Sequence, residues 1–147
     1  DWDDRGQLVF RGVITALLVG VLGLGWAASV GKPAEPIGKG VAPAVVAASS
    51  PAKIALAEHL TATGARIYTA YWCPHCHEQK ELFGKEATAK LTVIECAPDG
   101  RNSQKALCDE KKIEGYPTWE INGTLDSGVK PLAKLAEQSG YKGPVDF

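Results

Sequence analysis

The sequence predicts an α/β fold, a central mixed sheet flanked by helices, preceded by one transmembrane helix. Three observations carry this prediction: an uncharged run over residues 12–30, a proline-rich stretch over 31–52, and alternating helical and extended patterns from residue 53 to the end. A chain of 147 residues holds one modest domain with an appendage. The net charge of −1, with no block of like charge, gives no indication of nucleic-acid binding.

Residues 1–30 are predicted to form a transmembrane helix. The uncharged run over 12–30 would span about 28 Å as a helix, close to the hydrocarbon thickness of a bilayer. Trp26 near one end suits a membrane interface. A cleaved signal peptide is the alternative, but the start is acidic and the run exceeds the ~7–15 residues of a signal-peptide core. The chain begins with Asp1 and lacks methionine, so we expect it to be a piece of a longer protein.

Residues 31–52 are predicted to be a linker rich in proline and alanine, because four prolines and many small residues cannot bury a core. The folded domain is then expected over residues 53–147.

Within that domain the apolar spacing and the turn residues define each element in order. Helices are expected over 52–64, after Pro74, over 103–112 and from Pro131 to Gly140, with strands over 66–72 and 91–96 and a hairpin at Asn122-Gly123. The first two strands should be parallel, because a helix crosses between them. The segment where the first strand meets its helix lies at a carboxyl edge of the sheet, where such folds place their sites.

The sequence YWCPHCHEQK, residues 71–80, falls at that edge and contains two overlapping motifs. Cys73, Cys76 and His77 match the C-x-x-C-H of haem attachment. The same cysteines around Pro74 and His75 match a thiol–disulfide exchange site. A helix N-terminus favours an anion at Cys73, and Cys76 lies one turn further, within bridging reach. His75 can add a hydrogen-bond donor or a positive charge, so exchange is the favoured interpretation.

With the segment Gly115-Tyr116-Pro117-Thr118 directly before the hairpin, residues 53–141 resemble the thioredoxin superfamily. The resemblance implies a thioredoxin fold in which Pro117 is cis and lies against the two cysteines. It makes Cys73, Cys76, His75, Pro74 and Pro117 the candidate catalytic residues. It also makes Trp72, Tyr116 and Thr118 the candidates for binding a substrate chain.

The strings YWCPHC, QKELFG, GYPTW and ING, after a membrane helix and a proline-rich linker, are similar to one arrangement in particular. It is the carboxy-terminal thioredoxin-like domain of bacterial and plastid homologues of vitamin K epoxide reductase. The resemblance implies that residues 8–30 are a fifth membrane helix after a four-helix, quinone-reducing membrane domain. The expected activity is oxidation of reduced substrate proteins, with electrons passed to that domain. The fragment would bind no cofactor itself and would face the periplasm or the thylakoid lumen.

Two other functions remain open. A membrane-tethered reductant, for example in cytochrome maturation, would run the same cysteines in the opposite direction. Thioredoxins carry a buried acid six residues before the first cysteine, and Ile67 takes that position here, which weakens the case for a dedicated reductase. A non-enzymatic module would hold haem, with His59 or His75 as second ligand, or zinc.

Cys96 and Cys108 would complete a four-cysteine zinc site, but we expect them to form a structural disulfide in an oxidising compartment, with no metal bound. Free or relay thiols are the remaining alternative. Glu95 and Glu120 are either proton relays or solvated strand residues, and the latter is favoured.

Overall fold

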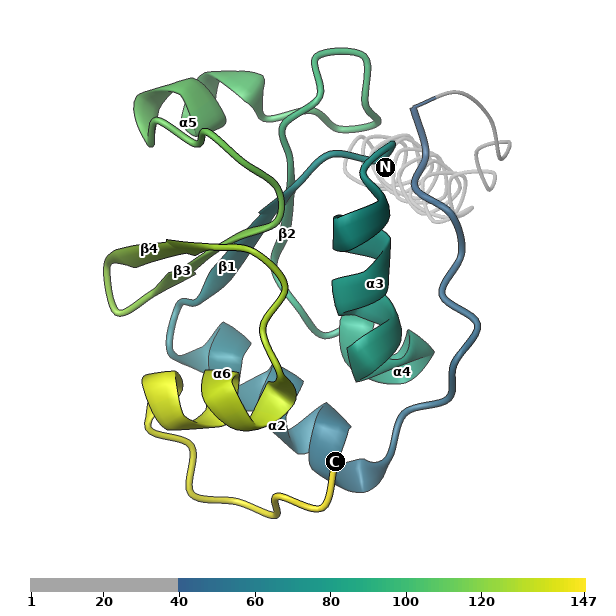
Figure 1. The fold of residues 1–147 in the computed structure, drawn as a ribbon, viewed down its shortest axis with the longest axis vertical. Coiled ribbons are helices and arrows are strands. Elements are labelled where there is room, and N and C mark those ends of the chain that lie inside the picture. Colours follow the sequence, from purple (N-terminus) through teal and green to yellow (C-terminus); the bar gives the residue numbers. More distant parts are fainter. Residues whose placement is uncertain (1–39) are drawn as a thin grey trace, which may run out of the picture. The chain divides into compact units, whose positions relative to one another are not determined.

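The computed structural model describes residues 40–147, and a four-stranded mixed sheet lies at the centre of this part of the chain (Figure 1). The strands are β1 (Arg66–Thr69), β2 (Val93–Glu95), β3 (Thr118–Ile121) and β4 (Thr124–Ser127), in the order β2-β1-β3-β4. β1 and β2 are parallel, and the other two pairs are antiparallel. The predicted α/β class with a mixed sheet is confirmed.

The predicted transmembrane helix over 1–30 and the first part of the predicted linker lie outside the described residues. Between residues 40 and 147, no helix is long and apolar enough to cross a membrane.

Five helices flank the sheet in the described part: α2 (Pro51–Ala62), α3 (Pro74–Phe83), α4 (Lys85–Thr88), α5 (Lys105–Glu110) and α6 (Leu132–Ser139). Successive strand residues point to opposite faces, so the sheet has two cores. Ile67 and Trp119 pack with residues of α2, α3, α4 and α6, whereas Tyr68 and Ile94 pack with α5. Figure 1 shows α5 set apart from the other four helices.

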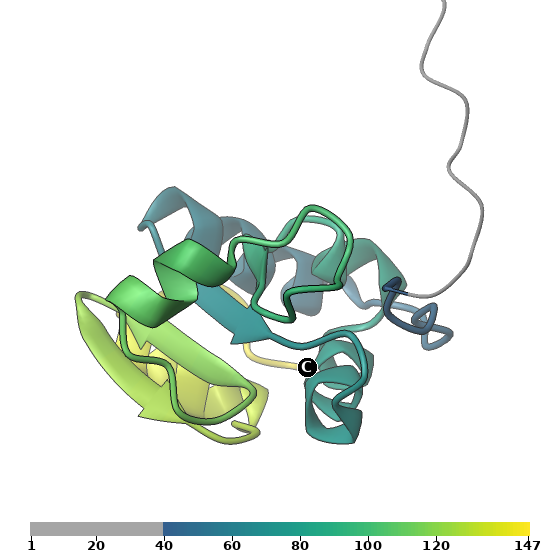
Figure 2. The same ribbon diagram turned by 90° about the horizontal axis from the view of Figure 1, so that it is seen from above.

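Two predicted element ends are wrong: the first strand was expected to reach residue 72, and the helix after Pro74 was expected to continue to residue 90. The first strand ends at Thr69, not at residue 72, because the backbone turns and the Cys73 N–H donates to the Ala70 carbonyl at 3.0 Å. Residues 70–72 therefore form the loop into α3, which Figure 2 shows between the β1 arrow and that helix. The helix after Pro74 breaks at Gly84, where φ is +87° and an added Cβ would lie 2.8 Å from the Ala48 carbonyl oxygen. Only glycine fits there.

The expected boundary between linker and domain is also displaced. α2 begins at Pro51, because Ser50 caps it by accepting from the Lys53 N–H and Pro51 suits the first turn. Ala52, assigned to the linker, is buried.

Residues 46–49, also assigned to the linker, are hydrogen-bonded to α3 and α4; we call them the strap. The Glu81 carboxylate accepts from the N–H groups of Val46 and Ala47, at 2.9 and 3.0 Å. The Ser49 hydroxyl donates to the Phe83 carbonyl at 2.8 Å. The part of the predicted linker next to the domain is thus tied to the helix that carries the cysteines.

The C-terminal third forms as the turn residues predict. Asn122 and Gly123 both have positive φ, 52° and 77°, which a tight two-residue hairpin requires. α6 follows Pro131, buries one face and ends at Gly140 in the left-handed conformation.

Candidate active site

Cys73 and Cys76 lie at the N-terminus of α3, where the loop from β1 delivers them. Cys73 is the N-cap residue and Pro74 occupies the first turn. Both cysteines are free thiols and buried, Cys73 at 8% exposure and Cys76 at 1%. The unpaired backbone N–H groups of a helix start interact favourably with negative charge in general. The expected anion at Cys73 remains a prediction.

The segment before β3 closes over the first cysteine. The Tyr116–Pro117 peptide bond is cis, and the Cys73 thiol donates to the Tyr116 carbonyl across 3.6 Å. Residues 43 positions apart in the sequence thus meet at one sulfur atom. The structure therefore brings together Cys73, Cys76 and the cis proline segment, the three parts that the resemblance to the thioredoxin superfamily assigns to the site.

The two thiols differ in their surroundings. Burial raises the pKa of Cys76 to about 12, and the neighbouring Cys73 acts in the same direction. Cys76 therefore holds its proton at neutral pH, while the less buried Cys73 is the sulfur that a partner reaches first. This asymmetry suits an attacking and a resolving cysteine.

The rim of the site is aromatic. Trp72 is 61% exposed, and its ring meets that of Tyr116 edge-on, with centroids 6.1 Å apart. Trp72 directly precedes Cys73 in the chain, and the Tyr116 carbonyl accepts from the Cys73 thiol, so both residues lie beside the site. Their roles as substrate contacts remain predictions.

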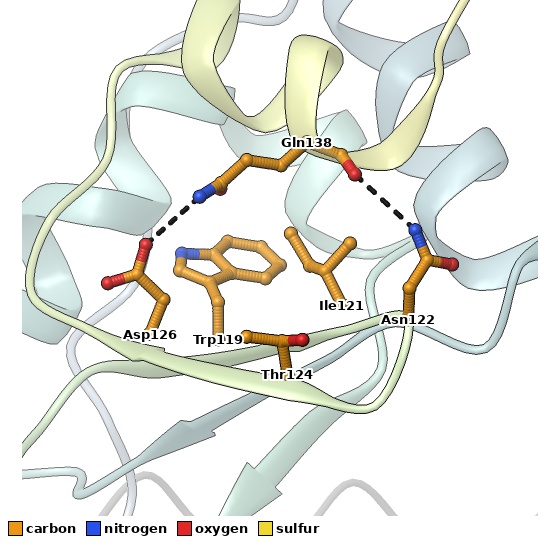
Figure 3. A pocket seen from close by; sticks show the side chains of 6 residues that line it. All are labelled: Trp119, Ile121, Asn122, Thr124, Asp126 and Gln138. Carbon is orange, nitrogen blue, oxygen red and sulfur yellow. Dashed lines mark hydrogen bonds between the residues drawn. The ribbon is translucent and has the colours of Figure 1, made fainter.

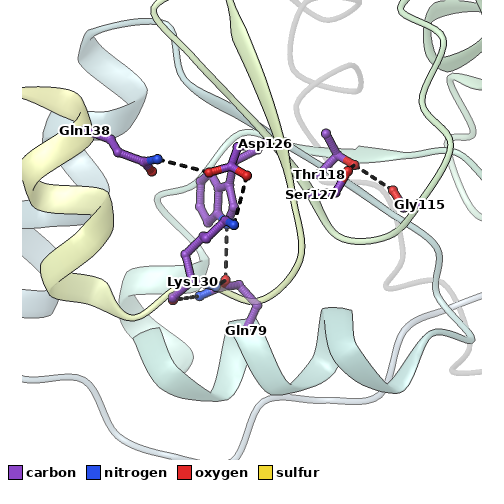
Figure 4. Close-up of polar contacts among 8 residues, drawn as sticks. Gln79, Gly115, Thr118, Asp126, Ser127, Lys130 and Gln138 are labelled. Carbon is purple, nitrogen blue, oxygen red and sulfur yellow. Dashed lines mark hydrogen bonds and ion pairs between the residues drawn. The ribbon is translucent and has the colours of Figure 1, made fainter.

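Thr118 does not belong to this rim, which corrects its assignment as a substrate-binding residue. It is 2% exposed, and its hydroxyl donates to the Gly115 carbonyl at 2.6 Å and lies 3.1 Å from the Ser127 hydroxyl. The side chain is therefore unavailable to a partner and instead holds the turn around Pro117 to β4 (Figure 4).

The three histidines have partners of their own. His75 is exposed, with Nδ1 3.4 Å from the Glu78 carboxylate, so its expected effect on the cysteines remains a prediction. His77, the histidine of the C-x-x-C-H motif, is half-buried and lies 3.3 Å from Glu81, the residue that holds the strap. His59, a candidate second haem ligand, contacts the Ser139 carbonyl at 2.9 Å through Nε2.

Cys96 and Cys108 are joined by a disulfide, with 5.8 Å between their Cα atoms. It links the end of β2 to α5 and lies in the smaller core with Tyr68 and Ile94. The zinc alternative needed these two sulfurs as free ligands. In residues 40–147, no group of three or more His, Cys, Asp or Glu is arranged to hold a metal ion.

Two buried polar residues of α3 were missed by the sequence analysis: Gln79 and Lys80, at 0% and 8% exposure. The Gln79 amide donates to the Lys130 carbonyl at 3.0 Å and accepts from the Lys130 N–H at 2.7 Å and from the Trp119 indole N–H at 3.2 Å (Figure 4). It clamps the cysteine-bearing helix to β3 and to the loop before α6. The available signal was helical spacing, since Cys76, Gln79, Lys80 and Phe83 share one face.

A cavity of about 300 Å³ lies between the β3–β4 hairpin and α6 (Figure 3). Its lining residues are Trp119, Ile121, Asn122, Thr124, Asp126 and Gln138. Gln138 crosses it and donates to Asp126 at 3.0 Å. None of the cysteines lines this cavity, so it is separate from the exchange site.

The fold and site define a thioredoxin-like domain that carries a paired-cysteine redox site. The chain is a homologue of a thiol-disulfide oxidoreductase: it is 50% identical over 100 residues to "Thiol-disulfide oxidoreductase LTO1" of Arabidopsis thaliana, an alignment covering 66% of this chain and 27% of that protein. It is also 36% identical over 70 residues to "Protein disulfide-isomerase" of Aspergillus oryzae, covering 44% of this chain and 12% of that one. The chain thus spans about a quarter or less of the length of these relatives. No family model matches the chain.

Proposed function

We propose that this chain is the redox domain of a membrane-anchored thiol–disulfide oxidoreductase that oxidises dithiols of substrate proteins. The observation that carries the proposal is the contact between the Cys73 thiol, at the start of α3, and the Tyr116 carbonyl of the cis proline segment. Cys76 lies behind Cys73 on the same helix, more deeply buried. The homology to two proteins named for disulfide chemistry supports the same activity.

The proposed reaction starts from the Cys73–Cys76 disulfide. A substrate thiolate attacks the Cys73 sulfur, a mixed disulfide forms, and Cys76 leaves as a thiolate that takes up a proton. A second thiolate of the substrate then attacks its own sulfur in the mixed disulfide and releases Cys73. The substrate loses two electrons and the domain gains them as a dithiol.

The rim explains how an unfolded partner would be held during this reaction. Trp72 and Tyr116 offer large aromatic faces beside the reacting sulfur. The Tyr116 carbonyl, which now accepts from Cys73, becomes free for a backbone N–H of the substrate once Cys73 is in a disulfide. Binding would then depend on backbone and apolar contact rather than on one substrate sequence.

The destination of the electrons rests on the sequence resemblance alone. We propose that the dithiol passes them to a quinone-reducing, four-helix membrane domain similar to vitamin K epoxide reductase, and that residues 1–30 anchor the domain beside it. The Cys96–Cys108 disulfide supports placement in an oxidising compartment, the periplasm or the thylakoid lumen.

Replacing Cys76 by alanine tests the proposal, because it leaves a mixed disulfide on Cys73 unresolved. With a synthetic disulfide-bonded peptide as probe, the Cys73 thiolate of the Cys76→Ala protein should attack the peptide disulfide, release one peptide sulfur as a thiol and keep the other in a covalent adduct that reductant removes. The Cys73→Ala protein should form no adduct. In membranes of the source organism, the same variant should capture a cysteine of a quinone-reducing membrane domain. Absence of the peptide adduct would refute the exchange activity.

The direction of electron flow is tested by the redox potential of the Cys73–Cys76 pair. A value above the roughly −270 mV of thioredoxin supports the oxidase. A value well below it, with capture of apocytochromes only, supports the tethered reductant instead.

A further inference from the structure

Lys80 is a charged residue in a core position of the active-site helix. It lies one turn after Cys76, so the two side chains share a face of α3 with Phe83. Only 8% of Lys80 is exposed, although burying an ammonium group is costly unless negative charge lies nearby. The chain therefore holds a positive charge beside the deeper cysteine.

Glu95 supplies the negative charge on the sheet side. It is paired with Thr69 in the β1–β2 register, at the end of β1 that leads to Cys73. Its Oε1 accepts from the N–H groups of Tyr71 and Ala97, both at 3.1 Å, which fixes the carboxylate beneath the loop before the cysteines. Gly100 covers it, since a Cβ there would lie 2.8 Å from the same oxygen. Glu95 is thus half-buried and hydrogen-bonded to the backbone rather than a fully solvated strand residue.

Cys76 and Glu95 are the charged or titratable groups that act on Lys80. Burial lowers the pKa of Lys80, and both of these groups oppose the shift. The nearby charges on adjoining elements have other partners: Glu81 binds the strap, and Lys130 pairs with Asp126 at 2.9 Å. Lys80 therefore has an ammonium that releases its proton more readily than a surface lysine, next to a thiol that holds its proton strongly.

We propose that Lys80 is the acid that protonates the Cys76 thiolate as it leaves, and that the charge of the Glu95 carboxylate favours the return of the Lys80 amine to its ammonium form. The inference rests on the proposed function. When a substrate thiolate breaks the Cys73–Cys76 bond, Cys76 departs as a buried anion. The Lys80 ammonium gives it a proton, which leaves a thiol and a neutral amine. The amine then regains a proton from solvent, and the negative charge of Glu95 favours the ammonium that results. In the reverse direction the neutral amine removes the proton from Cys76.

Single-turnover kinetics of the reduced protein with Ellman's reagent isolates this step. The reagent first forms a mixed disulfide on the more exposed Cys73, and Cys76 then releases the second thionitrobenzoate in a first-order step. That second rate, measured from pH 5 to 10, reports the ionisation of Cys76. Lys80→Met should slow it about tenfold at pH 7, equivalent to one unit in the pKa of Cys76, and move the profile to higher pH. Lys80→Arg should also slow the step, because a guanidinium keeps the positive charge but exchanges no proton in this pH range. Glu95→Gln should slow the step less than Lys80→Met.

The matched control is Lys134→Met, which removes an exposed lysine of α6 and should leave the profile unchanged. A Lys80→Met profile that superimposes on the wild-type profile overturns the inference. If the wild-type protein releases no second thionitrobenzoate, the proposed function fails instead.

A second measurement covers the case in which Lys80→Met does not fold. In the wild-type protein with oxidised cysteines, the ¹³Cε resonance of Lys80 should titrate at a lower pH than those of exposed lysines. In the reduced protein, the same resonance should titrate at a higher pH than it does in the oxidised protein. Titration together with the exposed lysines in both states overturns the inference.

Discussion

Replacing Gln79 by leucine tests whether its amide holds the active-site helix to the sheet. The substitution keeps the volume of the side chain but removes one donor and one acceptor. Three groups lose a partner: the Trp119 indole N–H and the backbone N–H and carbonyl of Lys130.

The expected loss follows from the burial of those groups. Trp119 is 1% exposed, so its N–H would be left unpaired away from water, at a cost of about 1–3 kcal/mol. The Lys130 groups are partly buried and can bond water, which costs roughly 0.5 kcal/mol each. The apolar side chain of the buried leucine offsets part of this loss of stability. We expect the free energy of unfolding to fall by about 2–3 kcal/mol, a large share of the 5–15 kcal/mol typical of a domain.

Urea unfolding of the oxidised protein, followed by far-ultraviolet circular dichroism, measures this loss. Gln104→Leu is the control, because Gln104 is exposed and its change should stay within about 0.5 kcal/mol. A double-mutant cycle with Trp119→Phe should show coupling of about 1 kcal/mol, since the two residues share one hydrogen bond. A Gln79→Leu protein as stable as the control, or a cycle without coupling, would refute the reasoning.

Three further predictions concern the disulfide, the resolving cysteine and the strap. Replacing Cys96 and Cys108 together by alanine should lower the free energy of unfolding by about 3 kcal/mol, because their bond closes a loop with a sequence separation of 12; a loss below 1 kcal/mol in urea would contradict this. Because the pKa of Cys76 is raised, the folded dithiol keeps a proton that the unfolded chain releases above about pH 9. The contribution of this thiol to the free energy of unfolding is therefore fully present below about pH 9 and is lost as the pH rises toward 12. Urea midpoints of the reduced protein should therefore fall relative to the oxidised protein above pH 9, and parallel curves would argue against it. Backbone hydrogen bonds hold the pKa of Glu81 below its ordinary value. The ionised carboxylate therefore binds the strap fully at pH values above the ordinary pKa of a glutamate, and this contact is lost as the pH falls through the lowered pKa of Glu81. Glu81→Gln should speed hydrogen exchange at the Val46 and Ala47 amides at pH 7, whereas unchanged exchange would show that other contacts hold the segment.

Signals that act over a few residues predicted most of the fold. Pro74 and Pro131 mark helix starts, the Asn122-Gly123 turn fixes the hairpin, and the spacing of Cys73 and Cys76 places both on one helical turn. These features depend on backbone preferences of the residues themselves, so they can be inferred without knowing what packs nearby.

The errors arose where a distant segment decides the local structure. Gly84 breaks the helix because Ala48 and Ser49 pack against it, and Thr118 is buried because Gly115 and Ser127 engage its hydroxyl. Neither contact has a local signature in the sequence.

The sequence by itself determined which residues are the candidates for disulfide exchange, because the spacing of Cys73 and Cys76 at a helix start is typical of that chemistry. Only the tertiary structure decided what surrounds them. Lys80 and Glu95 lie 15 positions apart in the chain, yet helix packing and strand register bring them close enough for the Glu95 charge to act on Lys80, which lies one turn after Cys76. Burial then alters how readily Cys76 and Lys80 lose a proton, and burial is a property of the folded molecule rather than of any short segment.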